Sequence, residues 1–207
     1  SEVLASGMIM LSGWRANKPF YDLMCGSGTL PIEAALIAHK IPGGYYRKSF
    51  GFERWLDFRA DLFNKIKQEH KPSFNPIYVI HGMDISHEAI NSSRKNARQA
   101  GLAEYIRFSV CDIFNTSKSS EEGMIIINPP YGERIKQYDL NAFYKKIGDV
   151  LKNHYQGYDA WILSSNKEAL KHVGLHADKN ITLYNGQLEC RYSHFRLYAG
   201  SYKKNRL

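Results

Sequence analysis

Hydrophobic and polar residues follow two different periods along this chain. Short apolar runs, typical of strands, alternate with stretches in which apolar residues recur every three or four positions, as on one face of a helix. The strand patterns lie at 19–24, 77–83, 105–110, 124–128, 160–164, 181–184 and 187–198. The helix patterns lie at the start of the chain, directly after residue 29, and at about 59–70, 86–100, 140–153 and 167–173. This alternation predicts an α/β fold with a mostly parallel sheet and right-handed crossovers.

Two of the strand patterns say where their strands lie in the sheet. The run Met124–Asn128 is almost purely apolar, which suits a strand that is buried on both faces. Asn185-Gly186 separates the last two patterns, and this dipeptide is a strong signal for a tight hairpin turn. We therefore expect a C-terminal hairpin that adds an antiparallel strand at one side of the sheet.

The chain divides into a short N-terminal segment and one domain. Residues 1–18 form a helix and a linker, and 19–207 form a domain of the size that one core supports. Within the domain, 42–76 is an inserted segment, marked by glycine and proline at its ends. The opening helix is expected to bury one face, formed by Leu4, Met8, Leu11 and Trp14. Because the chain starts at Ser1 inside this pattern, we expect it to derive from a longer protein.

The composition excludes several classes of protein. The chain is 43% hydrophobic and 23% charged, which is ordinary for a folded domain and argues against wholesale disorder. No apolar run approaches the roughly 18–20 residues that a membrane span needs, and no signal peptide is visible. Cys25, Cys111 and Cys190 are far apart and are expected to be buried thiols, which favours a cytoplasmic location. The eight histidines show no metal-binding spacing, so we predict no metal.

A glycine-rich turn joins the first strand to the following helix. It reads Asp22-Leu-Met-Cys-Gly-Ser-Gly-Thr29, and Gly26 and Gly28 let the backbone turn tightly and approach a ligand. The turn alone is a weak signal. Pro31 stands where a dinucleotide-binding fingerprint has its third glycine, and no lysine follows as in a P-loop. A tight turn without a ligand is therefore the alternative.

Acidic residues end three successive strands of the predicted sheet. Asp22, Asp84 and Asp112 close the first, second and third strand. The carboxyl ends of parallel strands share one edge, where open α/β folds bind ligands, so the three carboxylates are expected to line one site. They disfavour a pyrophosphate and suit a cationic ligand that also carries a ribose and an adenine amine. S-adenosylmethionine (SAM) has these groups, although each aspartate taken singly is more often a cap or turn residue.

A proline-rich loop follows the buried strand at 124–128. The Pro-Pro step makes this loop stiff, and its carbonyl groups are not tied up locally. The Asn128 amide oxygen and the Pro129 carbonyl can accept hydrogen bonds from one base amine and aim its lone pair at a methyl sulfonium. Tyr131 offers a ring on which a flipped base can stack. The predicted catalytic residues are Asn128, Pro129, Pro130 and Tyr131.

Basic residues exceed acidic ones in two segments of the chain. The formal net charge is +8; residues 41–76 hold seven basic and four acidic side chains, and 191–207 hold five basic and none acidic. A basic excess of this kind favours a polyanionic partner. In the first segment cations alternate with aromatic residues, as in single-strand RNA binding, although the aromatic residues could instead form a small core of the insertion. The predicted RNA contacts are Arg47, Lys48, Arg54, Arg134 and Lys136.

Four motifs resemble one known family. They are Asp22–Ala34, Phe50–Phe58, Asn128–Arg134 and Leu183–Arg191. Together they are similar to the THUMP-associated RNA methyltransferases, and most of all to the bacterial 23S ribosomal RNA guanine-N2 methyltransferases, long labelled N6-adenine-specific DNA methylases. The likeness covers nearly the whole chain. The family's N-terminal RNA-binding region is absent from this sequence.

The resemblance implies a fold, a cofactor and an activity. The fold would be the Rossmann-like class I SAM-dependent methyltransferase fold, with a seven-stranded, mostly parallel sheet and a C-terminal antiparallel hairpin. The 22–29 loop would hold the methionine part of SAM, Asp84 the ribose and Asp112 the adenine. The implied cofactor-binding residues are Asp22, Cys25, Gly26, Ser27, Gly28, Thr29, Asp84, Ile85, Asp112, Ile113 and Asn128.

The implied reaction is methyl transfer to an exocyclic amine of an RNA base, guanine N2 in 23S rRNA or in a ribosome assembly intermediate. Three alternatives stay open: adenine-N6 methylation of DNA or RNA, a non-catalytic SAM- or RNA-binding module, and a nicotinamide oxidoreductase. The missing third glycine and the Asn-Pro-Pro-Tyr loop weigh against the oxidoreductase.

Overall fold

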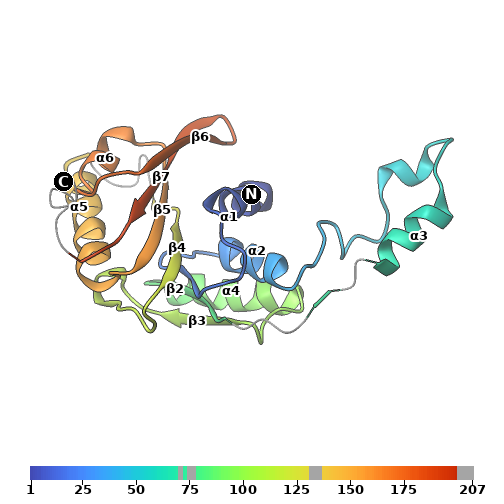
Figure 1. The fold of residues 1–207 in the computed structure, drawn as a ribbon, viewed down its shortest axis with the longest axis horizontal. Coiled ribbons are helices and arrows are strands. Elements are labelled where there is room, and N and C mark those ends of the chain that lie inside the picture. Colours follow the sequence, from blue (N-terminus) through green and yellow to red (C-terminus); the bar gives the residue numbers. More distant parts are fainter. Residues whose placement is uncertain (70–71, 74–77, 131–136, 200–207) are drawn as a thin grey trace, which may run out of the picture.

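A seven-stranded sheet with helices on both faces forms the centre of the molecule (Figure 1). The structure, a computed structural model, describes residues 1–69, 72–73, 78–130 and 137–199. The helices are α1 (Glu2–Ser12), α2 (Thr29–Ala38), α3 (Ala60–Glu69), α4 (His87–Gln99), α5 (Gln137–His154) and α6 (Lys167–Lys171). The strands are β1 (Phe20–Asp22), β2 (Ile80–Asp84), β3 (Ile106–Val110), β4 (Gly123–Ile127), β5 (Tyr158–Ser164), β6 (Lys179–Asn185) and β7 (Leu188–Arg196).

The strand order is β3-β2-β1-β4-β5-β7-β6. Strands β1 to β5 are parallel, and β7 pairs antiparallel with both β5 and β6. This order confirms the predicted mostly parallel sheet with a C-terminal hairpin. The chain reverses its direction across the sheet at β1, which lies between β2 and β4. Ligands of open α/β folds bind beside the carboxyl ends of the strands at such a point.

Successive residues of the central strands enter two different cores. Phe20 of β1 belongs to the core on one face of the sheet, and Tyr21 belongs to the core on the other. In the same way, Ile126 of β4 packs in the first core and Ile127 in the second. Helices α1, α2 and α4 cover the first face, and α5 and α6 cover the second (Figure 1). All five residues of β4 are buried, which explains its uninterrupted apolar sequence.

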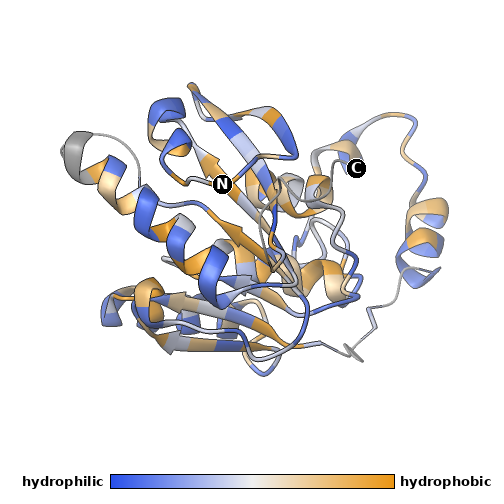
Figure 2. Cartoon of the chain, turned by 60° about the vertical axis from the view of Figure 1, so that its left-hand side comes forward, coloured by the Kyte–Doolittle hydropathy of each residue, from blue (hydrophilic) through white to orange (hydrophobic). Residues whose placement is uncertain are grey.

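The helices carry both polar and apolar residues along their length (Figure 2). Among the residues that the structure describes, no helix is long and apolar enough to cross a membrane.

The opening helix α1 belongs to the first core. Its buried residues are Ala5, Met8 and Ile9. The helix ends at Gly13, which has a φ of +80° and donates its N–H to the Met10 carbonyl. The expectation that Leu11 is buried is wrong: its side chain is 43% exposed, because the stripe that packs on the sheet side runs through Ala5 and Ile9. The predicted boundary after residue 18 stays a prediction.

The insertion extends from the body as a separate lobe, on the right-hand side of Figure 1. Four phenylalanine rings pack together in it, with centroid distances of 5.1–5.9 Å; they are Phe50, Phe52, Phe58 and Phe63. Trp55 lies at the margin of this cluster and is 68% exposed. The aromatic residues of the insertion therefore form the small core that was one of the two expectations, with Trp55 left largely at the surface.

Two helical glycines give a matched test of this packing. A Cβ at Gly148 of α5 would lie 1.8 Å from the Val173 carbonyl oxygen, whereas a Cβ at Gly7 of α1 would meet nothing within 4 Å. We expect Gly148→Ala to lower the free energy of unfolding by about 1–3 kcal/mol, because α5 must move away from the chain after α6. Gly7→Ala should raise it by about 0.5–1 kcal/mol. Urea unfolding followed by circular dichroism measures both, and equal effects would contradict the packing of α5 on Val173.

Candidate functional site

Two cavities lie beside the carboxyl ends of β1, β2, β3 and β4, and Met24 lines both of them. The first has a volume of about 240 Å³. Its lining includes Asp22, Cys25, Gly26, Ser27, Thr29 and Asn128. The second has a volume of about 130 Å³. Its lining includes Asp84, Ile85, Asp112 and Ile113. All the residues predicted to bind the cofactor except Gly28 therefore line one of two cavities that share a wall.

The two glycines of the turn after β1 have different tasks. Both have positive φ, +53° at Gly26 and +85° at Gly28, so each favours glycine. A Cβ at Gly28 would come within 2.8 Å of Ser93 Cβ, so this glycine allows α4 to pack against the start of α2. A Cβ at Gly26 would meet nothing within 4 Å, and Gly26 lines the first cavity. The backbone is therefore open to a ligand at Gly26, while Gly28 serves the fold.

Asp22 is a buried acid in the wall of the first cavity. It is 2% exposed, and its Oδ1 accepts a hydrogen bond from the Met24 N–H at 3.1 Å. Burial, with a smaller contribution from the nearby Asp84 charge, raises the pKa of Asp22 from 3.8 to about 8. The carboxyl is therefore mostly protonated at neutral pH, and a cation placed beside it would favour its ionised form.

Asp84 and Asp112 each hold the turn that follows their strand. Asp84 accepts hydrogen bonds from the N–H groups of Gly26 and Ser86, both at 2.9 Å, and Asp112 accepts one from Phe114 at 3.0 Å. An ionised carboxylate has about four acceptor positions, so these contacts orient the groups without exhausting them. Asp112 is thus the N-cap of the 3-10 helix Ile113–Asn115, Asp84 holds two turns, and both line the second cavity.

Asn128 lies directly after β4 and also lines the first cavity. Its Oδ1 atom is buried and has no hydrogen-bond partner among the described residues. A buried acceptor without a partner costs about 1–3 kcal/mol, so its presence in a cavity wall points to a ligand that donates a hydrogen bond. Of the next two residues, Pro129 is buried and Pro130 is exposed.

The predicted RNA-binding residues do not join these cavities. Arg47, Lys48 and Arg54 are exposed in the insertion and line neither cavity. The insertion connects the end of α2 to the start of β2, so it leaves the body at the edge of the sheet opposite to the carboxyl ends (Figure 1). The other two predicted RNA-binding residues, Arg134 and Lys136, lie outside the described residues, as does Tyr131, which was predicted to be catalytic.

Several lining residues have no signal in the sequence. Leu4, Ala5 and Met8 of α1 line the first cavity, together with Asn185, the last residue of β6 before the hairpin turn. Phe114 and Phe143 line the second, where their rings make an edge-to-face contact with centroids 5.8 Å apart. The α1 residues had the pattern of core packing and Asn185 had the pattern of a turn, so only the fold shows that they also reach a cavity.

The cysteines are free thiols. Cys25 and Cys190 are buried as expected, but Cys111 is only half-buried, because β3 is an edge strand. Burial and the charges of Asp22 and Asp84 raise the pKa of the Cys25 thiol, which keeps it protonated and a weak nucleophile. In the described part of the chain, no group of three or more His, Cys, Asp or Glu residues could hold a metal ion.

Comparison with known proteins gives consistent matches. A family model described as "RMKL-like, methyltransferase domain" matches residues 1–194. The ribosomal RNA large subunit methyltransferase K/L of Syntrophotalea carbinolica is 36% identical over 207 residues, which are 94% of this chain and 29% of that protein. The crystal structure of SMU.472 complexed with S-adenosylhomocysteine (SAH) is 30% identical with a TM-score of 0.88, over 97% of this chain and 53% of the other.

A further crystal structure carries a different name. It is that of a Listeria monocytogenes protein, described by prediction as an N6-adenine-specific DNA methylase. Its TM-score is 0.83 and its identity 29%, over 95% of this chain and 51% of the other. The chain spans about half of the two solved relatives and less than a third of the K/L methyltransferase.

Asp22→Asn should stabilise the ligand-free protein at alkaline pH. The folded state keeps Asp22 protonated up to about pH 8, whereas the unfolded chain loses this proton near pH 4. The contribution of Asp22 to stability is therefore full below about pH 4 and is lost as the pH rises through 8, by up to about 1.4 kcal/mol per pH unit. We expect urea unfolding at pH values from about 5 to 9 to show that the free energy of unfolding of the variant rises relative to that of the wild type up to about pH 8 and then stays level.

Asp159→Asn is a control of opposite sign. Hydrogen bonds from His194 and Lys18 lower the pKa of Asp159 to about 2, so this carboxylate stabilises the fold at every pH above about 4. Its loss should destabilise the protein throughout the range from about pH 5 to 9, the opposite sign to the effect of Asp22→Asn. A pH-independent effect of Asp22→Asn would contradict the buried, protonated state of Asp22.

Proposed function

The chain belongs to the RMKL-like methyltransferase domain family, whose cofactor is SAM, and on this basis we propose that it transfers a methyl group from SAM to an exocyclic amine of an RNA base. The observation that carries the proposal is the pair of cavities that share Met24. One has the glycine turn, the buried Asp22 and the unpartnered Asn128 oxygen; the other has two carboxylates and an apolar wall. An elongated ligand with a cationic end and a nucleoside end suits this arrangement.

We propose that the first cavity holds the methionine part of SAM and the second holds its adenosine. The open backbone at Gly26 and the Asp22 carboxyl would face the cationic end, where the ammonium and sulfonium charges favour ionised Asp22. Asp84 would accept hydrogen bonds from the ribose hydroxyls, and Asp112 one from the adenine amine. Ile85 and Ile113 would contact the faces of the adenine ring. The SAH complex of SMU.472 supports a cofactor of this class.

Asn128 is the residue that we propose to hold the reacting amine. SAM would supply an electrophilic methyl group on its sulfonium and, when the sulfur–methyl bond breaks, would leave as neutral SAH. The buried Asn128 Oδ1 atom, together with the Pro129 carbonyl, would accept both N–H groups of one base amine and turn its lone pair toward that methyl group. The stiff Pro-Pro step limits movement of the two acceptors. After transfer the amine nitrogen gives its extra proton to water, since neither acceptor is a base.

The finer substrate assignment is guanine N2 in 23S rRNA. It is supported by the rRNA large-subunit name of the K/L relatives and by the two acceptors at Asn128 and Pro129, which suit an exocyclic amine. The same two acceptors suit adenine N6, and the name of the Listeria protein favours this second candidate. Arg47, Lys48, Arg54, Arg134 and Lys136 would contact the RNA backbone, and the reaction would take place in the cytoplasm.

Asn128 variants test the catalytic assignment. We expect Asn128→Leu, which removes the acceptor and keeps the volume, to lower the single-turnover rate of methyl transfer about 100- to 1,000-fold. Asn128→Asp keeps an acceptor oxygen and should retain more activity than the leucine variant. Calorimetry with SAM should show a much smaller effect on cofactor affinity in both cases. Full activity of Asn128→Leu would show that another group holds the amine.

The target base is tested by mass spectrometry of rRNA nucleosides. A strain that lacks the gene should lose an N2-methylguanosine, and the full-length gene should restore it. Loss of an N6-methyladenosine would select the second candidate. Failure of the wild-type chain to bind SAM or SAH in calorimetry would overturn the methyltransferase proposal itself.

A further inference from the structure

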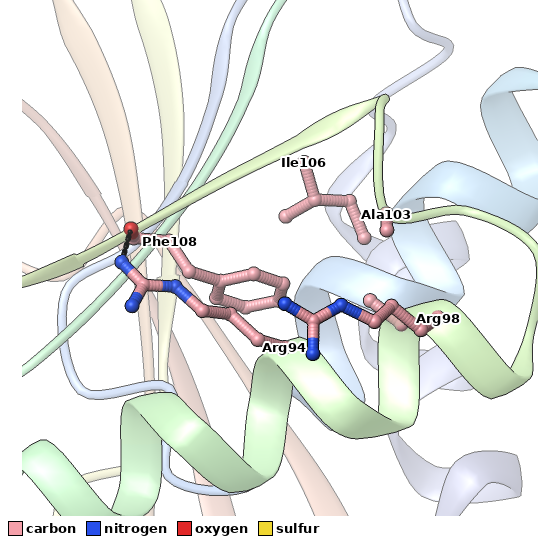
Figure 3. A pocket seen from close by; sticks show the side chains of 6 residues that line it. Arg94, Arg98, Ala103, Ile106 and Phe108 are labelled. Atoms are coloured by element: carbon pink, nitrogen blue, oxygen red, sulfur yellow. Dashed lines mark hydrogen bonds between the residues drawn. The ribbon is translucent and has the colours of Figure 1, made fainter.

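A cavity of about 290 Å³ lies between α4 and the edge strand β3, apart from the two cavities of the candidate site. Arg94 and Arg98, one helical turn apart on α4, both line it; Arg94 reaches across to β3, whereas the Arg98 side chain runs along α4 (Figure 3). Ile106 and Phe108 of β3 form its apolar wall. The cavity thus combines two guanidinium groups with an apolar floor at an exposed edge of the sheet.

Neither guanidinium group is neutralised by an acid among the described residues, and that of Arg94 is held in position. Arg94 donates one hydrogen bond from Nη2 to the Phe108 carbonyl oxygen at 2.9 Å, which fixes the group and leaves its other N–H donors free for a ligand (Figure 3). The side chains of Arg98 and Lys95 make no hydrogen bond or ion pair with any residue that the structure describes. Three cations within five positions of α4 therefore carry uncompensated charge.

Other helices place an acid beside at least one of their lysines. On each of α3, α5 and α6 one lysine pairs with a carboxylate of its own helix; the pairs are Lys65–Glu69, Lys145–Asp149 and Lys171–Glu168. The single acid of α4 is Glu88, in its first turn, and it accepts a hydrogen bond from Ser86 instead. A helix that concentrates cations without acids favours an anionic partner.

The positive surface continues from α4 into the insertion. The Tyr46 hydroxyl donates to the Ala100 carbonyl at the end of α4 at 2.6 Å, which joins the insertion to this helix one residue before Arg47 and Lys48. On the same helix, Asn96 Nδ2 donates to the Ser27 carbonyl of the glycine turn at 2.9 Å. The surface therefore runs from the cofactor turn to the insertion. We call its cations the α4 strip: Arg47, Lys48, Arg94, Lys95 and Arg98.

We propose that the α4 strip binds the phosphate backbone of the RNA substrate, outside the cavities where the reaction takes place; this inference rests on the proposed function. Guanidinium groups bind phosphate oxygens in a bidentate manner, and Arg94 is already oriented for it. The wall formed by Ile106 and Phe108 gives a ribose an apolar surface. Arg47 and Lys48 lie away from the cavities of the candidate site. As members of the α4 strip they would bind the same stretch of RNA backbone as the α4 cations.

RNA binding at several salt concentrations tests the proposal. The probe is a fluorescent RNA stem–loop, titrated with the whole chain. We expect Arg94→Gln/Arg98→Gln to weaken binding about 10-fold near physiological salt and to reduce the slope of log K against log salt by about 1–2. A matched control, Arg15→Gln/Lys152→Gln, removes the same charge from exposed positions elsewhere and should have a much smaller effect.

Each result has a defined meaning. The proposal is wrong if the α4 variant binds RNA with the affinity and salt slope of the wild type. It is also wrong if the control loses as much affinity as the α4 variant, or if the wild type binds no RNA. Inorganic phosphate that binds the chain as tightly as the RNA does would also overturn it, in favour of a free-anion site. Lys95→Gln breaks no contact in the described structure and should weaken RNA binding by a smaller factor. It replaces the double variant as the test if loss of the Arg94 hydrogen bond unfolds that variant.

SAM calorimetry on the same samples reports the proposed function separately. We expect the α4 variant to bind SAM like the wild type. If the wild type does not bind SAM, the methyltransferase proposal is wrong, but the RNA titration still tests whether the α4 strip binds RNA.

Discussion

The packing of the Phe108 ring against two glycines is the constraint on which the rest of the structure depends. A Cβ at Gly28 would come within 2.8 Å of Ser93 and 3.2 Å of Phe108, and a Cβ at Gly82 would come within 2.6 Å of the same ring. The ring of β3 therefore occupies space that only glycine leaves open on β2 and on the turn after β1. This contact brings α2, α4 and the first three strands together, and so places the ends of those strands side by side.

The same contact explains why the turn departs from the dinucleotide-binding fingerprint. In that fingerprint the third glycine allows the helix to approach the sheet closely. Here Pro31 stands at this place, and its Cγ would lie 3.1 Å from a Cβ on Gly82. The glycine that permits the close approach is thus Gly82 on the neighbouring strand β2, instead of a residue on the helix α2. Since Gly28 serves packing, Gly26 alone opens toward the cavity, where Asp84 holds its N–H group.

The sequence was sufficient for the sheet and for the residues at the ends of its strands. Periodicity predicts the strands, and because parallel strands end at one edge, it also brings Asp22, Asp84 and Asp112 together. It could not show that Asp22 is protonated, because that depends on the depth of burial, nor that the Asn128 oxygen has no hydrogen-bond partner among the described residues. It also misplaced Leu11, since spacings of three and four residues fit more than one helix face until α1 packs on its neighbours.

Charge shows most clearly what a linear count of residues omits. The count assigns the positive excess of the chain to the insertion and the C-terminal segment and treats the rest as neutral. In the fold, five described lysines of that neutral part pair with a carboxylate, whereas Arg94, Lys95 and Arg98 meet none among the described residues. Electrostatic attraction for a polyanion depends on such unpaired clusters more than on the total charge. The insertion matters for the same reason: the Tyr46 hydrogen bond to Ala100 joins its cations to those of α4, although the two segments are about fifty residues apart in sequence.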